Sequence, residues 1–245
     1  MLESGPVNAA DFNDIINHLL PDIIVSGHVD PEACRAAMPE DIEELRAILR
    51  NAVPRVEVEE EVLGCLTSVA AERLAAKGEA LVLGRPLNYI GYRMNARKAT
   101  ICVGGGAGQF LGAFMEAGAI VCEGDCGHFA FRGASGGRAL IMGSAGDYCS
   151  EELHGSVRVR VMGNVGRSAA RRMMGGELRV EGDAGPFFCR YMEAGTAHAR
   201  EVELLGETFG GIIHVRKVKA REKENDGRHD ATLIVDTPQS APPSQ

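Results

Sequence analysis

The stretch Gly104–Gly112, GGGAGQFLG, is the first candidate for chemistry, because glycine-rich loops can hold phosphates with their backbone N–H groups. A dinucleotide-binding loop has the spacing G-x-G-x-x-G and leads directly into a helix. This stretch lacks that spacing, and only five residues separate Gly112 from Gly118, which is too short for the helix. The sequence therefore predicts a structural turn here and not a phosphate site.

The cysteines are the second candidate, because thiolates ligate zinc and iron–sulfur clusters. The four that invite a cluster hypothesis are Cys122, Cys126, Cys149 and Cys189. The chain has seven cysteines, an odd number, and no C-x-x-C pair, which argues against a zinc site and a disulfide framework. A buried thiol behaves as a small apolar group. The sequence predicts structural cysteines, with no metal and no cofactor bound by this chain.

Histidines and arginines complete the candidates. His128 and His154 have neither a nucleophile nor a second ligand at a suitable spacing, so surface positions are predicted for both. A group of arginines falls close together in the repeat described below: Arg160, Arg167, Arg171, Arg172 and Arg179. They are either solvated surface residues or a basic patch that docks an acidic subunit or an anionic substrate. The sequence predicts no catalytic residue.

Charge and glycine are distributed unevenly along the 245 residues. Residues 1–77 carry 15 acidic and 6 basic side chains, whereas residues 78–245 carry 19 and 20. The net charge of −8 argues against a general nucleic-acid-binding protein. The longest uncharged stretch, Ala99–Met115, is too short and too rich in glycine to span a bilayer, and the chain does not start with a signal peptide. These features predict a cytoplasmic protein without a membrane partner.

Residues 1–77 are predicted to form short helices. Helices are expected over Ala9–Leu20, from Asp30-Pro31 onward, from Pro39 onward, and over Ser68–Lys77, where Gly78 ends the last one. Ile42, Leu45, Ile48 and Leu49 form the apolar face of the third helix. The acidic run Glu59–Glu61 is either a solvated face or a docking surface for a basic partner.

From residue 78 onward the chain repeats the frame G-x-x-G. The paired glycines are Gly105 and Gly108, Gly124 and Gly127, Gly143 and Gly146, Gly163 and Gly166, and Gly182 and Gly185. Their first members are 19, 19, 20 and 19 residues apart, and Gly84 and Gly206 begin degenerate copies, which makes about seven coils. The positions two and four residues before each first glycine are apolar, so alternation places both on one face of a short strand.

In the first six coils, the position five residues after the first glycine is aromatic in all but one: Tyr89, Phe110, Phe129, Tyr148, Ser168 and Phe187. Units of this kind bury their apolar residues only when they stack about 4.8 Å apart into one continuous core. The sequence therefore predicts a mainly β protein. A single-stranded parallel β-helix occupies residues 78–219, between an acidic helical region, 1–77, and a polar C-terminal tail, 220–245. Within that tail a short strand is expected at Ala231–Val235.

The position three residues before the first glycine is predicted to point away from this core. It is apolar in the early coils and charged later: Leu81, Cys102, Val121, Leu140, Arg160, Arg179 and Glu203. An exposed apolar stripe of this kind needs a cover. The cover is either the chain's own N-terminal helices or a partner subunit, and either one would also protect the open end of the β-helix from edge pairing.

The stretch Gly105–Gly118, followed by Ala119–Asp125, resembles the GXGXG repeat domain, and Tyr89-Ile90-Gly91 is similar to the first coil of that family. This domain is the right-handed β-helix at the C-terminal end of the glutamate synthase large subunit. It is also similar to the β-helix subunit of formylmethanofuran dehydrogenase. The resemblance covers residues 79–216 and departs from the family pattern at Phe131, Ser150 and Ala170, where the family has glycine, and in an insert at Thr196–Glu201.

The resemblance implies a non-catalytic structural subunit of a multi-subunit oxidoreductase in nitrogen metabolism, serving glutamate or N-methylglutamate synthesis. FMN and an iron–sulfur cluster are then expected on partner chains, namely glutaminase-like and FMN-binding subunits. Two alternatives stay open. One is the β-helix subunit of a formylmethanofuran dehydrogenase or formyltransferase/hydrolase complex, and the other is a self-standing β-helix enzyme.

Overall fold

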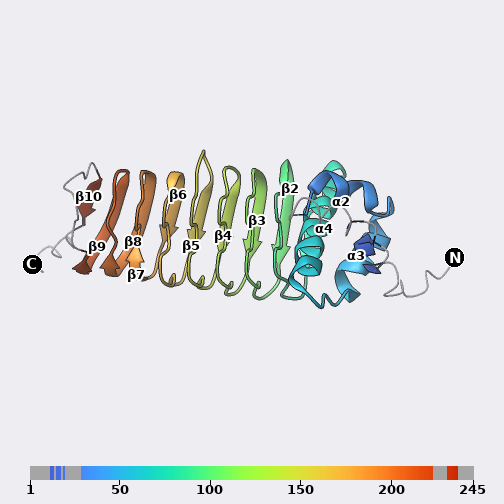
Figure 1. Ribbon diagram of the computed structural model, residues 1–245, viewed down its shortest axis with the longest axis horizontal. Helices are drawn as coiled ribbons and strands as arrows, with labels where there is room; N and C mark the ends of the chain where they lie inside the picture. The colour runs from blue at the N-terminus through green and yellow to red at the C-terminus, as the bar shows by residue number, and fades with distance from the viewer. Residues whose placement is uncertain (1–11, 14, 18, 20–28, 223–230, 237–245) are drawn as a thin grey trace, which may run out of the picture.

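The structure is a computed structural model, and it describes residues 12–13, 15–17, 19, 29–222 and 231–236. A group of helices lies at one end of a long row of parallel strands, and the chain advances coil by coil towards the other end (Figure 1). The predicted architecture, a parallel β-solenoid with a small N-terminal helical region, is confirmed, with about eight turns where about seven coils were predicted.

Two short helices, α2, Pro31–Ala37, and α3, Ile42–Asn51, precede the long helix of this region. Each begins after an aspartate whose carboxylate accepts a backbone N–H of the first turn at 3.0 Å, Asp30 for α2 and Asp41 for α3. The helix expected from Pro39 therefore starts at Ile42. Its predicted apolar face is confirmed, since Leu45, Ile48 and Leu49 are buried.

Helix α4, Glu57–Ala76, begins eleven residues earlier than predicted and ends as expected at Gly78, where φ is +77°. The acidic run Glu59–Glu61 lies inside it and is half-buried. Glu60 accepts a hydrogen bond from the Asn88 amide at 2.9 Å, and Glu61 accepts one from the Val29 N–H at 3.2 Å. The carboxylates of Glu60 and Glu61 thus also join α4 to neighbouring segments of the same chain.

The helix predicted at Ala9–Leu20 lies partly outside the described residues. Those that are described there are helical, and the four apolar ones are buried: Phe12, Ile15, Ile16 and Leu19. They belong to the same apolar cluster as α4 and the first coils of the solenoid. The 3–4 spacing of these residues predicted a helix with one apolar face, and the described residues confirm that this face packs into the core.

In the described part of the chain, nine strands follow one another in the order of the sequence, each parallel to the next, and a further strand lies beside them. The nine are β1 Leu81–Leu83, β2 Asn95–Val103, β3 Ala117–Cys122, β4 Arg138–Ile141, β5 Arg158–Val161, β6 Met174–Val180, β8 Ala194–Leu205, β9 Ile212–Arg221 and β10 Thr232–Val235. Strand β7, Ala184–Phe188, pairs with the second half of β8. Each turn of the solenoid thus lays one strand against the same strand of the previous turn.

The inward ladders predicted from the repeat are confirmed. One of them runs Ile101, Ile120, Ala139, Val159 and Leu178, each paired with the next and each buried. A second ladder of small residues, at isolated parallel bridges, joins Ala107, Cys126, Ala145, Val165 and Ala184. Because like residues lie over like, every coil completes the core of its neighbours, and no coil has a core of its own.

The predicted aromatic ladder is confirmed over its first four positions and ends at Ser168. The rings of Tyr89, Phe110, Phe129 and Tyr148 stack in sequence with centroid distances of 4.6, 5.0 and 5.0 Å. Their backbones have φ near +58°, which L-residues other than Asn and Asp adopt at a cost. Stacked pairs contribute roughly 0.5–1.5 kcal/mol beyond their buried area, which offsets that cost. Phe131, Ser150 and Ala170, at the family's glycine positions, have positive φ as well.

The predicted register fails at the first coil by one residue. Leu81 pairs with Ile101 and is 2% exposed, whereas Val82 pairs with Cys102, faces outward and is 72% exposed. The outward placement of Leu81 was wrong, and Val82 takes its position. The reason is that Arg85, and not Gly84, occupies the place of the repeat's first glycine, so the glycine pattern misaligns this coil.

The register also fails after the sixth coil. Strand β8 is long and is not interrupted by a glycine turn. In its first half Ala197 pairs with Leu178 on β6 and with Ile213 on β9. In its second half Val202 pairs with Ala184 on β7. The stretch Thr196–Glu201 is therefore the core strand of its coil and no insert, and Gly206 starts no repeat. The predicted strand at Ala231–Val235 is confirmed as β10, and β9 extends to Arg221, into the predicted tail. Residues 223–230 and 237–245 lie outside the described residues.

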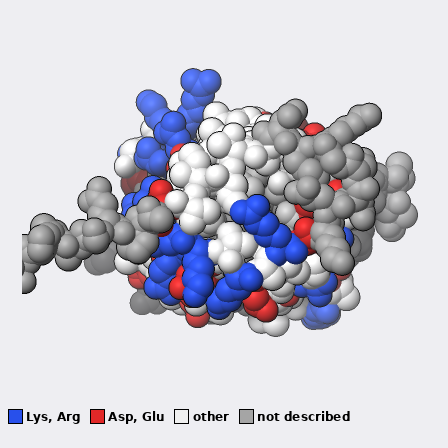
Figure 2. All heavy atoms as spheres, turned by 90° about the vertical axis from the view of Figure 1, so that its left-hand side faces the viewer, with Lys and Arg blue, Asp and Glu red and all other residues white. Residues whose placement is uncertain are grey.

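Helix α4 lies across the first coil and covers that end of the solenoid (Figure 1). The Gly91 N–H donates to Thr67 Oγ1, and the Ser68 hydroxyl donates to the Tyr92 carbonyl, both at 2.8 Å. The helices thus protect an edge, as predicted, but they leave Val82 exposed, so they do not cover the outward apolar stripe. At the other end, Figure 2 shows Lys and Arg side chains bordering a mostly uncharged centre.

Candidate functional site: a groove and an exposed sheet face

The glycine-rich stretch Gly104–Gly112 forms a turn of the solenoid, as predicted. It follows the end of β2, and its backbone bonds to the coils on either side, with the Gly104 N–H donating to Leu83 and the Ala107 N–H donating to Asp125. An added Cβ at Gly106 would lie 2.8 Å from the Asp125 carbonyl oxygen. The glycines therefore serve close stacking of coils, and the N–H groups of Gly104, Gly108 and Gly112 donate to backbone carbonyls within the chain.

The cysteines lie where a small apolar residue would. Cys122, Cys126, Cys149 and Cys189 are all buried. Burial raises the pKa of the Cys149 thiol to about 12 and also raises the pKa values of the other three, so all four stay protonated at neutral pH. Among the described residues, no three His, Cys, Asp or Glu side chains are placed to hold a metal ion.

The five arginines do not form one patch, which favours the alternative of separate surface residues. Arg160 and Arg179 project from the outward side of β5 and β6, where both contact Glu181 at 2.8 and 2.7 Å. Arg171 contacts Glu151 on another side of the solenoid, Arg172 lies 3.7 Å from Glu152, and the Arg167 guanidinium lies 4.8 Å from the centre of the Phe187 ring. Acidic neighbours therefore balance most of this charge.

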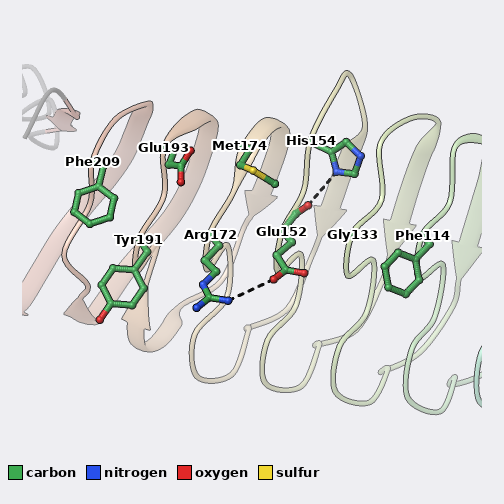
Figure 3. A pocket seen from close by; sticks show the side chains of 9 residues that line it. All are labelled: Phe114, Gly133, Glu152, His154, Arg172, Met174, Tyr191, Glu193 and Phe209. Carbon is green, nitrogen blue, oxygen red and sulfur yellow. Dashed lines mark hydrogen bonds and ion pairs between the residues drawn. The ribbon is translucent and has the colours of Figure 1, made fainter. Parts of the chain in front are cut away.

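A groove of about 580 Å³ runs along one side of the solenoid and crosses several coils (Figure 3). It is lined by Phe114, Gly133, Glu152, His154, Arg172, Met174, Tyr191, Glu193 and Phe209. Phe114 lies beside Gly133, where an added Cβ would come within 2.7 Å of the ring, and Tyr191 stacks on Phe209 at 5.8 Å. The groove thus has aromatic rings towards both ends and an exposed Met174 between them.

Sequence reasoning missed this groove, although a signal exists. Phe114, Gly133, Glu152, Arg172 and Tyr191 each stand nine residues after the first glycine of their repeat. Because one offset in a solenoid forms one line along its surface, these residues must lie in a row. These residues are of a different type in each coil, so the sequence shows no repeated residue at this position, and the row becomes visible only in the structure.

The groove contains acid–base side chains. Its acid–base groups are Glu152, His154 and Glu193, and its lining includes no Ser, Thr or Cys that could act as a nucleophile. Glu152 faces Arg172 at 3.7 Å, and the His154 ring nitrogen Nδ1 lies 3.2 Å from the Glu152 carbonyl oxygen (Figure 3). The other predicted histidine, His128, accepts the Asp147 N–H at 2.9 Å and so joins two coils.

The second surface is an apolar sheet face on the outward side of β1 to β5. Val82, Cys102, Val121 and Leu140 stack on one another in register. Met142 lies two residues after Leu140, and Met162 lies at the same position of the next coil. They are 55% and 42% exposed. We call these six residues the sheet face. It contains three of the four predicted interface positions, and Val82 replaces Leu81.

Further along the same outward row, the rings of His198 and His214 stack at 4.5 Å with an angle of 6° between their planes. Burial lowers the pKa of His198, and His214 and Arg179 lower it further, against the opposing effect of Glu177 and Glu181. The folded chain therefore takes up this proton at a lower pH than the unfolded chain, whose histidines titrate near about 6.5. Protonation accordingly favours unfolding as the pH falls below about 6.5.

We expect the melting temperature of the wild-type chain to fall between pH 7.5 and pH 5.5, and the His198→Gln variant to lose less over the same interval. Glutamine keeps a polar side chain at this position and removes the titration. Circular dichroism melts of both proteins at the two pH values measure the difference. Equal losses in the two proteins would show that His198 does not contribute to acid sensitivity.

Neither models of protein families nor curated protein sequences match this chain. Among the described residues, every helix is too short or too polar to cross a lipid bilayer.

Proposed function

We propose that this chain is a non-catalytic scaffold subunit that holds partner proteins against its sheet face. The observation that carries the proposal is the exposure of Val82, Met142 and Met162, at 72%, 55% and 42%, beside the stacked Cys102 and Val121. Contiguous exposed apolar residues on a protein surface mark an interaction site, particularly when polar residues surround them. A solenoid fixed by ladders in every coil presents this surface with little loss of conformational freedom on binding.

The resemblance to the GXGXG domain gives the proposed complex. We propose a glutamate-synthase-like oxidoreductase, in which partner chains carry FMN, the iron–sulfur cluster and the glutaminase nucleophile. The buried, protonated cysteines and a groove whose lining includes no Ser, Thr or Cys fit a chain that leaves the chemistry to its partners. In the alternative, this chain is the β-helix subunit of a formylmethanofuran-type complex, and the sheet face would again bind the partner proteins.

Affinity purification of the tagged full chain from its native cell tests the proposal. We expect glutaminase-like and FMN-binding proteins to co-purify with the wild type, whereas molybdopterin-dependent and amidohydrolase-like proteins would support the alternative complex. The Leu140→Asp variant should retain less than a tenth of these partners, because binding would bury a charged side chain where the partner presents an apolar surface.

The matched control is Met174→Asp, which places the same charge on an exposed apolar residue in the groove. It should keep its partners. Partner loss in Met174→Asp together with retention in Leu140→Asp would move the docking site from the sheet face to the groove. Unchanged circular dichroism spectra check that both variants fold.

A further inference from the structure

A row of basic side chains borders the sheet face at the end where its strands begin. Arg97, Lys98, Arg138 and Arg158 surround an open hollow of about 730 Å³. Glu116 is the one acidic residue among the side chains that line this hollow. The border therefore carries an excess of positive charge in a molecule whose overall net charge is −8.

Strand register places this basic border directly beside the apolar residues. Arg138 and Arg158 pair with each other on β4 and β5, and Arg138 stands two residues before Leu140 on the same side of β4. Arg97 and Lys98 lie in the irregular part of β2, where the register shifts just before Thr100. A partner that covers Leu140 and Val121 must therefore also approach these cations.

The charges of this border are left largely unbalanced within the chain. Arg158 lies 3.9 Å from Glu177 with its side chain 79% exposed, and the described residues provide no ion pair for Arg97, Lys98 or Arg138. By contrast, Arg160 and Arg179, the next arginines on the outward side, share Glu181. Like charges on neighbouring strands destabilise a sheet, so Arg138 beside Arg158 is unfavourable until an anion lies near both.

We infer that the protein docking on the sheet face has an apolar contact surface with a row of carboxylates along one border, positioned over Arg138 and Arg158. This inference rests on the proposed function. An acidic protein surface is favoured over a free anion or a nucleic acid, because the cations adjoin an exposed apolar face that neither of those would cover. At the opposite ends of the strands the border carries the exposed Glu123, so the charges also fix which way round the partner binds.

Site-specific photo-crosslinking tests the inference in the full chain. A photoreactive amino acid replaces Val121, the tagged protein is made in its native cell, and the crosslinked peptide is sequenced by mass spectrometry. We expect a segment of another protein in which apolar residues are flanked by Asp and Glu. A segment from a second copy of this chain, or one flanked by Lys and Arg, would overturn the inference.

Charge reversal gives the quantitative arm of the experiment. The pair Arg138→Glu and Arg158→Glu should lower the crosslinking yield about tenfold, the equivalent of about 1.4 kcal/mol, and 0.5 M salt should lower the wild-type yield in the same direction. The matched control pair Arg216→Glu and Lys217→Glu, on exposed residues of β9, should leave the yield unchanged.

The outcomes separate the inference from the proposed function. If Leu140→Asp abolishes crosslinking while the Arg138 and Arg158 reversal leaves it intact, the sheet face docks a partner but the acidic border is wrong. If the wild type gives no crosslink to any other protein, both the proposed function and the inference fall.

Discussion

The Gly136→Ala variant is expected to lose about 3 kcal/mol of unfolding free energy, a large loss for the addition of a single methyl group. An added Cβ at Gly136 would lie 2.1 Å from the carbonyl oxygen of Glu116 in the previous coil, a distance that real Cβ atoms do not reach. The obstacle is backbone, so no side chain can rotate away. The two coils must separate locally, which weakens the ladders on both sides.

The matched control is Gly84→Ala. An added Cβ at Gly84 meets no atom within 4 Å, and neither glycine has a left-handed backbone, so the two substitutions differ only in the space available. The control should change stability by less than about 0.5 kcal/mol. Thermal melts should show a fall of roughly 6–12 °C for Gly136→Ala and little change for Gly84→Ala. Equal melting temperatures would mean that the coils are not stacked this closely.

The Glu151→Gln variant is expected to lose about 2 kcal/mol. The Glu151 side chain is 4% exposed, and its two carboxylate oxygens contact Arg171 at 2.6 Å and Arg132 at 3.3 Å, one arginine from each neighbouring coil. Glutamine keeps the shape and removes the charge, so both guanidinium groups lose their buried counter-ion. Because the two arginines are partly exposed, water offsets part of the loss, which therefore stays below that of a fully buried pair.

Glu152→Gln provides the comparison, because it removes the charge of the next residue. The Glu152 side chain is 29% exposed, and the arginine nitrogens nearest to it lie 3.7 Å away, so the expected loss is under about 1 kcal/mol. Denaturant titrations in 0.1 M and 1 M salt separate the two cases. The Glu151 effect should persist at high salt, since a buried pair is poorly screened, while the Glu152 effect should shrink. Equal and equally salt-sensitive losses would refute the buried arrangement.

The central coils could be predicted from sequence because each of their constraints recurs at a fixed offset. The glycines at 124, 143, 163 and 182 mark turns whose close approach excludes a Cβ, and Gly105 has a φ of +92° that favours glycine. The stacked core tolerates only apolar residues such as Ile101 and Ile120. Since stacking imposes the same environment on each coil, the same residue pattern recurs in all five repeats. That redundancy made the solenoid predictable.

The terminal coils lacked this redundancy. At Leu81 and Val82 two apolar residues stand side by side, and a neighbouring glycine that is not part of the turn favoured the wrong register. In β8 the turn has no glycine, so the pattern continued only through Ala197 and Ala199, which are too small to signal a core strand by themselves. Helix α4 was predicted too short because the half-buried carboxylates of Glu60 and Glu61 resembled a solvated segment.

The candidate site was predictable only in part. Cys102, Val121 and Leu140 were placed on the outward side by alternation alone, which suffices in a flat strand. The groove and the basic border depend on which coils lie next to each other and on how side chains such as Glu181 and Glu151 neutralise nearby arginines. Those are contacts between residues about 20 positions apart, and a single sequence does not contain them as a pattern.

The size of the native assembly tests the central claim most directly, namely that the chain acts by holding a partner on its sheet face. Multi-angle light scattering of the tagged protein purified from its native cell should give a mass well above the 26.1 kDa of one chain, and Leu140→Asp should elute as a folded 26.1 kDa monomer. A wild-type protein that is itself a 26.1 kDa monomer, or a Leu140→Asp variant with the wild-type mass, would contradict the account.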